Sequence, residues 1–540
     1  MKARNLNLKK TLGRMSTPEI RKELDNLPAP DAQNLCGHEA YALPEEIQLL
    51  SMLNTLKMEP QFYQGTNDQV KRLQDLIEKV AIRDPYFAAQ CIVYSRCVGE
   101  GMRTVNHIAA ALLTPYLRGQ EWGKRFFSSW NKKAGRGGCI FRLDDMAEIK
   151  TVYQMLNGGG VLANAMKKGF KTVLEGSDSY QILKYKKAVI DLTNLVHPNI
   201  AKCLGKVEIN GEKIVTIDAL MRGLSVSADT WEANNSEAGQ LVAAAKREGK
   251  ISEEEAKELL DTAKAENWDG LLRDKKLGIL AALRNIRNIL EVCDDVTALC
   301  NLLSDEDQII KGKIMPYQID MAYEVVSNEC PGNLHTRKVL AALERGYVAS
   351  VPNLAQVCTG RNLVILDCSG SMCTSMRDAR TGRSFGSCID KASLIAATIV
   401  QATNADVIRF GSSAQYASGM NGRNLFEYSQ YLRRADMGGT NLAAAFRLIT
   451  DLGKEYDRIF ILSDNECNSG YQASAYADYI RRVNSPYIYS VDLAAYGTTP
   501  LKNTEKVAYF YGYGYGMFTD IKNREFRAED HLEKVRQIVI

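Results

Sequence analysis

The 540-residue sequence predicts a multi-domain protein in which an all-helical part precedes a smaller α/β part. A chain of this length exceeds what one hydrophobic core usually supports, so two or more domains are expected. Apolar residues recur at helical spacing over the first 350 residues, whereas strand-like apolar runs alternate with helical segments beyond that point. We therefore expect a helical domain at residues 1–355 and an α/β domain, with a doubly wound parallel sheet, at residues 356–540.

The first domain shows amphipathic helical spacing and almost no strand-like alternation. Apolar side chains recur every three or four residues, for example over 47–56, 277–290 and 319–326. Consecutive helices of this length, joined by short turns, predict an α-solenoid of the HEAT type that contains no sheet. The polar stretch 232–266 is expected to form a solvent-exposed helical pair without a functional role.

In the second domain, four apolar runs have the length of buried strands, and helical segments separate them. The predicted strands are 362–366, 406–410, 458–463 and 487–492, and the predicted helices are 390–402, 441–452 and 471–483. Strands that alternate with helices predict a parallel sheet covered on both faces. Open sheets of this kind bind ligands at the edge where the strands end.

Side chains with oxygen donors gather at that edge. Asp367, Ser369 and Ser371 follow the first strand, Asp464 ends the third, and Thr440 lies in the turn before a helix. Hard oxygen donors of this kind suit Mg²⁺, which prefers octahedral oxygen coordination. Since only two of the five are carboxylates, the bound ion would stay electropositive and favour an acidic partner. The alternative interpretation is that these residues only cap helices, as Asp and Ser often do.

Basic residues are concentrated in one window of the helical domain. The net charge of +4 is too small to indicate nucleic-acid binding, but residues 101–187 contain 15 Lys or Arg and 6 Asp or Glu. Trp and Tyr side chains in the same window could stack on bases. Because such windows are also typical of solvated surfaces, composition alone leaves both interpretations open.

The composition also bears on location and activity. Thirteen cysteines without a CxxC pair predict buried free thiols and a reducing cytoplasm. The first ten residues lack the apolar core of a signal peptide, and no run of 18 apolar residues predicts a membrane span. Neither a GxxxxGK[ST] loop nor an HExxH motif is present, so no enzymatic activity is expected.

The five oxygen-bearing residues of the α/β domain match, position by position, the metal-ion-dependent adhesion site of von Willebrand factor A domains. This resemblance covers residues from about 358 to the end of the chain. It implies a Mg²⁺ ion with one coordination position left for water or for a carboxylate of a partner.

The order of the two domains resembles that of the Ro autoantigen family, whose helical-repeat part is called the TROVE domain, in a bacterial- or phage-type form. Five segments carry the resemblance: 96–103 (RCVGEGMR), 192–198 (LTNLVHP), 281–286 (AALRNI), 315–319 (MPYQI) and 462–466 (LSDNE). The resemblance implies a monomer whose helical repeats close into a ring joined by the α/β domain. It also implies binding of Y-type noncoding RNA on the outer surface, binding of single-stranded 3′ ends of misfolded RNA in the hole, and a role in RNA quality control, in some bacteria with an exoribonuclease.

Within this family resemblance, His197 matches an RNA-contacting histidine, and a basic segment with Lys184, Lys186 and Lys187 precedes it. Lysines that neutralise phosphates give salt-sensitive binding with little sequence preference. Lys132 and Arg136 have the same chemistry without a motif match. The alternative for His197 is that it ends its helix before a proline. The alternative for the whole chain is a metal-dependent protein-interaction scaffold that binds no RNA.

Overall fold

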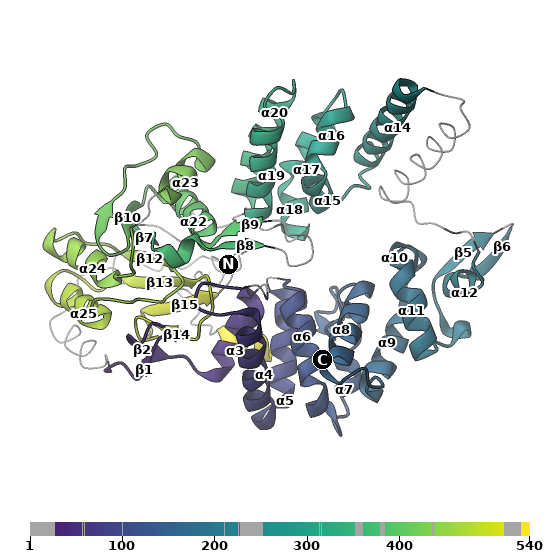
Figure 1. Ribbon diagram of the computed structural model, residues 1–540, viewed down its shortest axis with the longest axis horizontal. Helices are drawn as coiled ribbons and strands as arrows, with labels where there is room; N and C mark the ends of the chain where they lie inside the picture. The colour runs from purple at the N-terminus through teal and green to yellow at the C-terminus, as the bar shows by residue number, and fades with distance from the viewer. Residues whose placement is uncertain are drawn as a thin grey trace, which may run out of the picture. The chain divides into compact units, whose positions relative to one another are not determined.

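The computed structural model in Figure 1 describes most of the chain from residue 28 onward. The described residues are 28–56, 58, 60–99, 101–209, 211–224, 226, 252–312, 314, 316–350, 360–377, 384–434, 437–511 and 531–540. The domain boundary expected at residues 355 and 356 lies outside the described residues, and so does the first part of the polar stretch 232–266.

The chain forms two compact units, and each unit combines segments that are far apart in the sequence. The α/β unit comprises residues 1–76 and 351–530, and the helical unit comprises residues 77–350 and 531–540. The first 76 residues thus group with the α/β unit, whereas a division at residue 355 places them in the helical domain. Each unit is described below by itself.

A six-stranded sheet forms the centre of the α/β unit. Its strands are β7 (Asn362–Asp367), β10 (Asp406–Phe410), β11 (Ala414–Tyr416), β12 (Arg458–Ser463), β13 (Tyr487–Asp492) and β15 (Val507–Tyr511). The order is β11-β10-β7-β12-β13-β15, with all neighbours parallel except the edge strand β11, which runs antiparallel to β10. The predicted parallel sheet is confirmed, and each of its four predicted strands agrees within one residue.

Helices cover both faces of this sheet, as the doubly wound fold predicts (Figure 1). They are α22 (Cys388–Thr403), α23 (Leu425–Arg433), α24 (Leu442–Asp451) and α25 (Gln472–Arg482). Leu363 and Ile365 of β7 pack in one cluster with Phe446 of α24 and Tyr479 of α25. Because side chains alternate along a strand, the intervening residues of β7 face the side on which α22 lies.

The N-terminal segment joins the α/β unit through backbone pairing. Strand β2 (Glu39–Ala42) pairs with β1 (Ala32–Gln33) on one side and with β14 (Thr498–Thr499) on the other. Helix α3 (Glu45–Thr55) follows and contacts β15. Strands β1 and β2 lie in residues for which the sequence predicts only helices, so that expectation is wrong for residues 32–42. A short hairpin, β8 (Ser375–Arg377) with β9 (Ser384–Ser387), completes the unit.

The helical unit consists of helices that contact their neighbours along the chain, as in a helical-repeat array. Helix α4 (Thr66–Arg83) contains the division between the two units. The other helices are α5 (Pro85–Val93), η1 (Tyr94–Val98), α6 (Thr104–Leu113), η2 (Thr114–Leu117), α7 (Gly123–Phe126), α8 (Leu143–Leu156), α9 (Asn164–Gly176), α10 (Ser179–Lys184), α11 (Lys186–Val196), η3 (Ile200–Lys202), α12 (Thr216–Met221), α14 (Glu253–Arg273), α15 (Ile279–Arg284), α16 (Ile286–Val292), α17 (Thr297–Leu303), α18 (Glu306–Gly312), α19 (Pro316–Glu329), α20 (Thr336–Ala349) and α27 (His531–Arg536).

Two hairpins interrupt the helices of this unit, so the expectation of a region without any sheet is also wrong here. The first pairs β3 (Trp130–Asn131) with β4 (Arg136–Gly137), and the second pairs β5 (Lys206–Ile209) with β6 (Glu212–Val215). In the first hairpin Gly137 has a φ of +132°, and a Cβ there would lie 2.4 Å from the Ser129 carbonyl oxygen. Only glycine therefore allows the two strands to approach this closely.

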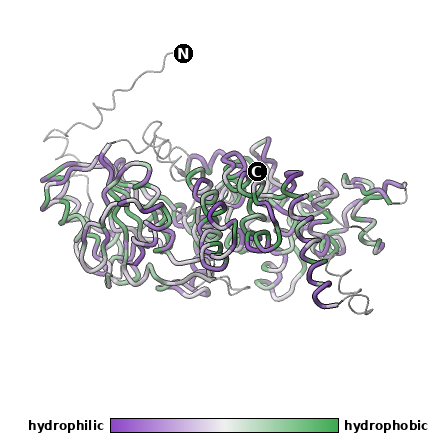
Figure 2. Tube along the Cα trace, turned by 90° about the horizontal axis from the view of Figure 1, so that it is seen from above, coloured by the Kyte–Doolittle hydropathy of each residue, from purple (hydrophilic) through white to green (hydrophobic). Residues whose placement is uncertain are grey.

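Figure 2 shows hydrophobic and hydrophilic residues alternating along the trace of the helices, as expected for amphipathic helices that bury one face. In helix α9 the buried residues Met166, Phe170, Val173 and Leu174 follow this spacing. In the part of the chain that the structure describes, no helix has both the length and the apolar character that crossing a membrane requires.

Candidate functional site

Two carboxylates meet at the C-terminal edge of the central sheet because β7 and β12 are parallel neighbours. Asp367 is the last residue of β7, and Asp464 directly follows β12. The hydroxyl of Ser463 donates a hydrogen bond of 2.5 Å to Oδ2 of Asp367, which ties the two strand ends together. Sheet topology therefore places both predicted carboxylates at one edge.

Backbone hydrogen bonds bring the third predicted loop to the same edge. The Gly370 N–H donates to the Gly438 carbonyl at 3.0 Å, and the Met437 N–H donates to the Cys368 carbonyl at 3.0 Å. The Thr440 N–H donates to Oδ1 of Asn468 at 2.9 Å, and the Asn468 N–H donates to the Thr440 carbonyl at 3.0 Å. The loops that carry all five predicted metal-binding residues are thus joined at one edge.

The two carboxylates share a buried environment that disfavours their charges. Burial, followed by the nearby charge of Asp464, raises the pKa of Asp367 to about 7. Burial likewise raises the pKa of Asp464, although a hydrogen bond from the Ser371 side chain acts in the opposite direction. No basic side chain is among the groups that shift either pKa. Among the described residues, no basic side chain neutralises these two buried carboxylates, and a metal ion would do so.

The hydroxyls complete a donor set suited to a hard cation. Ser369 and Ser371 are buried, and their Oγ atoms lie 3.2 Å apart. The Ser369 N–H donates to Oδ1 of Asp367 at 2.9 Å, which orients that carboxylate. In the described residues no three carboxylate, imidazole or thiol groups surround one point, so an ion at this edge would also depend on hydroxyl oxygens and water. The chemistry of the residues therefore fits Mg²⁺.

Several side chains of the N-terminal segment lie against this edge, and sequence reasoning did not identify them. The Leu35 N–H donates to Oε2 of Glu466 at 2.9 Å. The hydroxyl of Tyr63 forms hydrogen bonds with the side chains of Ser371 and Cys36, and burial raises its pKa. Burial and the charge of Asp464 raise the pKa of Glu466 to about 8. No spacing in the sequence links Tyr63 to residues that lie 300 positions away.

A second candidate site lies on the helical unit, at the junction of helices α10 and α11. Lys184 ends α10, and Lys186 and Lys187 occupy the first turn of α11; all three side chains are exposed. The positive end of a helix dipole disfavours cations, and neither an acidic residue nor a side-chain cap compensates at the start of α11. Two lysines in this unfavourable position indicate that the junction suits an anionic ligand.

His197 ends helix α11 in a left-handed backbone conformation, with a φ of +48°. Its N–H donates to the Thr193 carbonyl at 3.0 Å, so the capping interpretation is confirmed for the backbone. The side chain is exposed, so the cap leaves the imidazole accessible to a ligand. The RNA contact expected for this ring stays a prediction.

The structure links the β3–β4 hairpin to the α10–α11 junction through aromatic side chains. Nζ of Lys132 lies 4.7 Å from the centre of the Phe141 ring. The next residue, Arg142, donates from Nε to the Tyr185 hydroxyl at 2.8 Å, and Tyr185 precedes α11. Arg142 was not among the predicted residues, and no motif marks it. We call the set Lys132, Arg136, Arg142, Lys184, Lys186 and Lys187 the basic surface.

Neither a comparison with known protein families nor one with curated proteins finds a match for this chain. Among solved structures it is similar to the Ro (RSR) protein of Deinococcus radiodurans, with a TM-score of 0.55 and 16% sequence identity. The similarity covers 89% of this chain and 99% of that protein. The chain therefore has the fold of a Ro protein, as the sequence resemblance predicted: helical repeats together with an α/β domain like that of von Willebrand factor A.

Proposed function

We propose that the protein is a non-enzymatic RNA-binding protein of the Ro type. The observation that carries this proposal is the basic surface, in which the exposed Lys186 and Lys187 lie in the first turn of α11 with no acidic residue in that turn to compensate them. Phosphates attract such cations without regard to base sequence. The likeness in fold to a Ro protein supports the same assignment.

We further propose that the RNA is a structured noncoding RNA of the Y type, bound on the helical unit, and that single-stranded ends of misfolded RNA also bind, as the family resemblance implies. A role in RNA quality control, with an exoribonuclease as a partner, follows from the same resemblance. We place the protein in the cytoplasm because no cysteine of the described residues forms a disulfide.

The sheet edge of the α/β unit would hold Mg²⁺ through Asp367, Asp464 and the nearby hydroxyls of Ser369, Ser371 and Thr440. The ion would supply a positive charge that attracts a carboxylate of a protein partner. The residues themselves hold the ligand oxygens in place, since Ser463 and the Ser369 N–H both bind Asp367. The alternative function, a metal-dependent scaffold without RNA, uses this edge alone and predicts no salt-dependent RNA binding.

Replacing Lys184, Lys186 and Lys187 with alanine is expected to weaken binding of a structured small RNA. The slope of log K against log salt should fall by roughly 0.7–0.9 for each phosphate that the variant no longer neutralises, because each neutralised phosphate releases condensed counterions. His197→Ala should weaken binding as well, with little change in slope if the ring donates only a hydrogen bond. Fluorescence anisotropy over a series of salt concentrations measures both quantities.

The matched control is Asp367→Ala, which alters the α/β unit and should leave RNA affinity nearly unchanged. An equal loss of RNA affinity in this variant, with its fold intact, would place the RNA at the sheet edge instead. A wild-type protein that binds RNA without any salt dependence would favour the scaffold alternative.

A further inference from the structure

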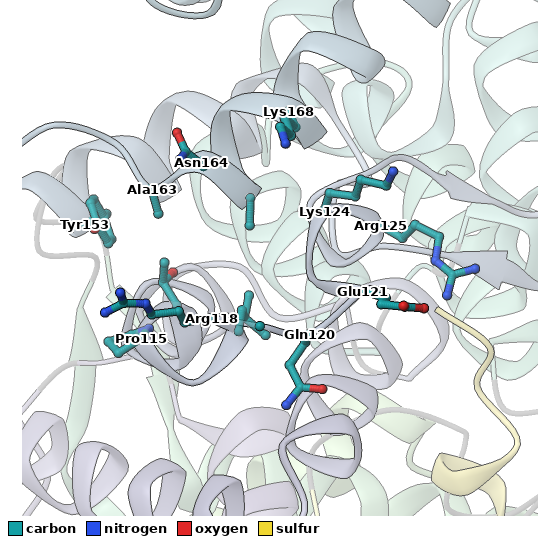
Figure 3. Close-up of a pocket in the computed structure, with 14 residues that line it drawn as sticks. Pro115, Arg118, Gln120, Glu121, Lys124, Arg125, Tyr153, Ala163, Asn164 and Lys168 are labelled. Carbon is teal, nitrogen blue, oxygen red and sulfur yellow. The ribbon is translucent and has the colours of Figure 1, made fainter.

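A cavity of about 1170 Å³ opens in the helical unit, between the loop that follows η2, the short helix α7 and the start of α9 (Figure 3). Four cationic side chains and one carboxylate line it. The cations are Arg118, Lys124, Arg125 and Lys168, and the carboxylate is Glu121. None of these residues belongs to the basic surface.

The four cations have no partner of opposite charge in the described part of the chain, although Glu121 lines the same cavity. All four side chains are exposed, and Figure 3 shows them around the cavity, with Lys124 and Arg125 near Glu121 and Lys168 on α9. Like charges that gather around one cavity repel each other unless an anion neutralises them. The cavity thus has the charge that an anionic ligand complements.

The first turn of helix α9 contributes to the same wall. Asn164 and Ala165 line the cavity, and the N-cap residue Ala163 provides no side-chain hydrogen bond. No acidic residue follows in the first turn. The first N–H groups of a helix have no partner within the helix, and they lie at the positive end of its dipole. Together with the four cations, they form a wall that suits phosphate groups.

We propose that this cavity binds the phosphates of a single-stranded RNA segment, at a place separate from the basic surface. The inference rests on the proposed RNA-binding function and adds a second binding region to it. The cavity volume lies near the upper end of the roughly 300–1,000 Å³ of small-molecule pockets, and the four cations around it offer places for more than one phosphate of a strand. Tyr153, a half-buried residue of the wall, offers a ring on which a base of that strand can stack.

The first test compares two double variants that remove the same charge. Lys124→Gln with Lys168→Gln alters the cavity, whereas Lys257→Gln with Lys311→Gln alters exposed lysines of α14 and α18. For a labelled uridine oligonucleotide, the salt slope should fall by about 0.7 for each phosphate left without its lysine, in the cavity variant only. Two such phosphates correspond to a roughly 25-fold weaker affinity near 0.1 M salt. Equal behaviour of the two double variants would overturn the inference.

The second test uses a substitution that does not threaten the fold. Ala163 has φ −59° and ψ 145°, a conformation typical of N-cap residues, so Ala163→Asp should cap α9 and raise the melting temperature. The new carboxylate would also occupy the free N–H groups and repel phosphate, so RNA affinity should fall. A more stable variant with unchanged RNA affinity would overturn the inference.

Uridine monophosphate distinguishes a strand from a free nucleotide. We expect it to compete only weakly with the oligonucleotide, and competition at equal concentration would show a mononucleotide site instead of a strand site. Failure of the proposed function is recognised separately, because wild-type protein would then show no salt-dependent RNA binding. If RNA binding depends on Lys184, Lys186 and Lys187 but not on Lys124 and Lys168, only the cavity inference fails.

Discussion

Asp145→Ala is expected to destabilise the helical unit by about 3–5 kcal/mol, because it leaves a buried arginine without its partner. Both oxygens of Asp145 accept hydrogen bonds of 2.8 Å from Arg96, and His107 Nε2 lies 3.0 Å away. Arg96 has an exposed fraction of 5% and Asp145 of 0%. The backbone N–H groups of Phe141 and Arg142 also donate to Asp145, so one substitution removes several hydrogen bonds at once.

Denaturant unfolding followed by tryptophan fluorescence measures this effect selectively. All four tryptophans of the chain lie between residues 77 and 350, so the signal reports the helical unit and not the α/β unit. The control is Asp144→Ala, which removes the neighbouring carboxylate. Asp144 pairs with Arg103 and Arg142, and all three side chains are partly exposed, so its loss should destabilise the unit less than the loss of the fully buried Asp145. Similar destabilisation by both substitutions would contradict the assigned role of Asp145.

The same network predicts how stability depends on pH. Burial and the nearby charge of Arg103 both lower the pKa of His107. Hydrogen bonds with Asp145 and Glu148 have the larger effect and raise this pKa above its ordinary value. A raised pKa in the folded state stabilises the protein below pH ~6.5, and this contribution is lost as pH rises through the folded-state value. Unfolding free energy from tryptophan fluorescence should therefore fall more between about pH 6 and pH 9 in wild type than in His107→Gln. If the unfolding free energies of wild type and His107→Gln depend on pH equally, His107 is not the group responsible for the pH dependence.

At the acidic end the network acts through Asp145. Burial raises its pKa, but the hydrogen bond from His107 and the charge of Arg96 lower it by more, so the pKa lies below its ordinary value. A lowered pKa in the folded state stabilises the protein above about pH 4, and that contribution is lost as pH falls further. The network therefore stabilises the helical unit most between about pH 4 and about pH 6.5.

The sequence allowed the α/β unit to be predicted where local patterns determine the structure. The apolar run 459–462 lies between Arg458 and Ser463, and β12 extends over these two flanking residues as well. Strand β11 has only three residues, which is too short for a recognisable pattern. The hairpin of β5 and β6 does have a local signal in the sequence, because Asn210-Gly211 is typical of a two-residue hairpin turn.

Features that depend on distant contacts were beyond local reasoning. The pairing of Tyr41 with Thr499 places the N-terminal segment in the α/β unit, and no local pattern reveals a partner more than 450 residues away. The five oxygen-bearing residues were predictable because each follows a strand or precedes a helix, and parallel topology then brings such positions to one edge. Arg142 was not predictable because its place in the basic surface depends on its hydrogen bond with Tyr185.

Removal of one carboxylate at the sheet edge is expected to reverse the order of stabilities when Mg²⁺ is added. Without metal, Asp464→Asn should be at least as stable as wild type, because it removes a buried charge that raises the pKa of Asp367. With Mg²⁺ at 100 times its Kd, wild type should gain about 2.7 kcal/mol, whereas the variant should gain little. Differential scanning calorimetry in chelator and in Mg²⁺ measures both states.

Asp406→Asn provides the matched control, since Asp406 begins β10 and therefore lies at the opposite edge of the same sheet. Its carboxylate is half-exposed and pairs with Lys454, so this variant should keep the full response to Mg²⁺. The decisive result is that Mg²⁺ reverses the order of stability of wild type and Asp464→Asn. A variant that is destabilised in general would be less stable than wild type both with and without Mg²⁺. A wild-type protein that gains no stability from millimolar Mg²⁺ would show that the two carboxylates do not hold the ion. The repulsion between the carboxylates of Asp367 and Asp464 would then only destabilise the folded protein.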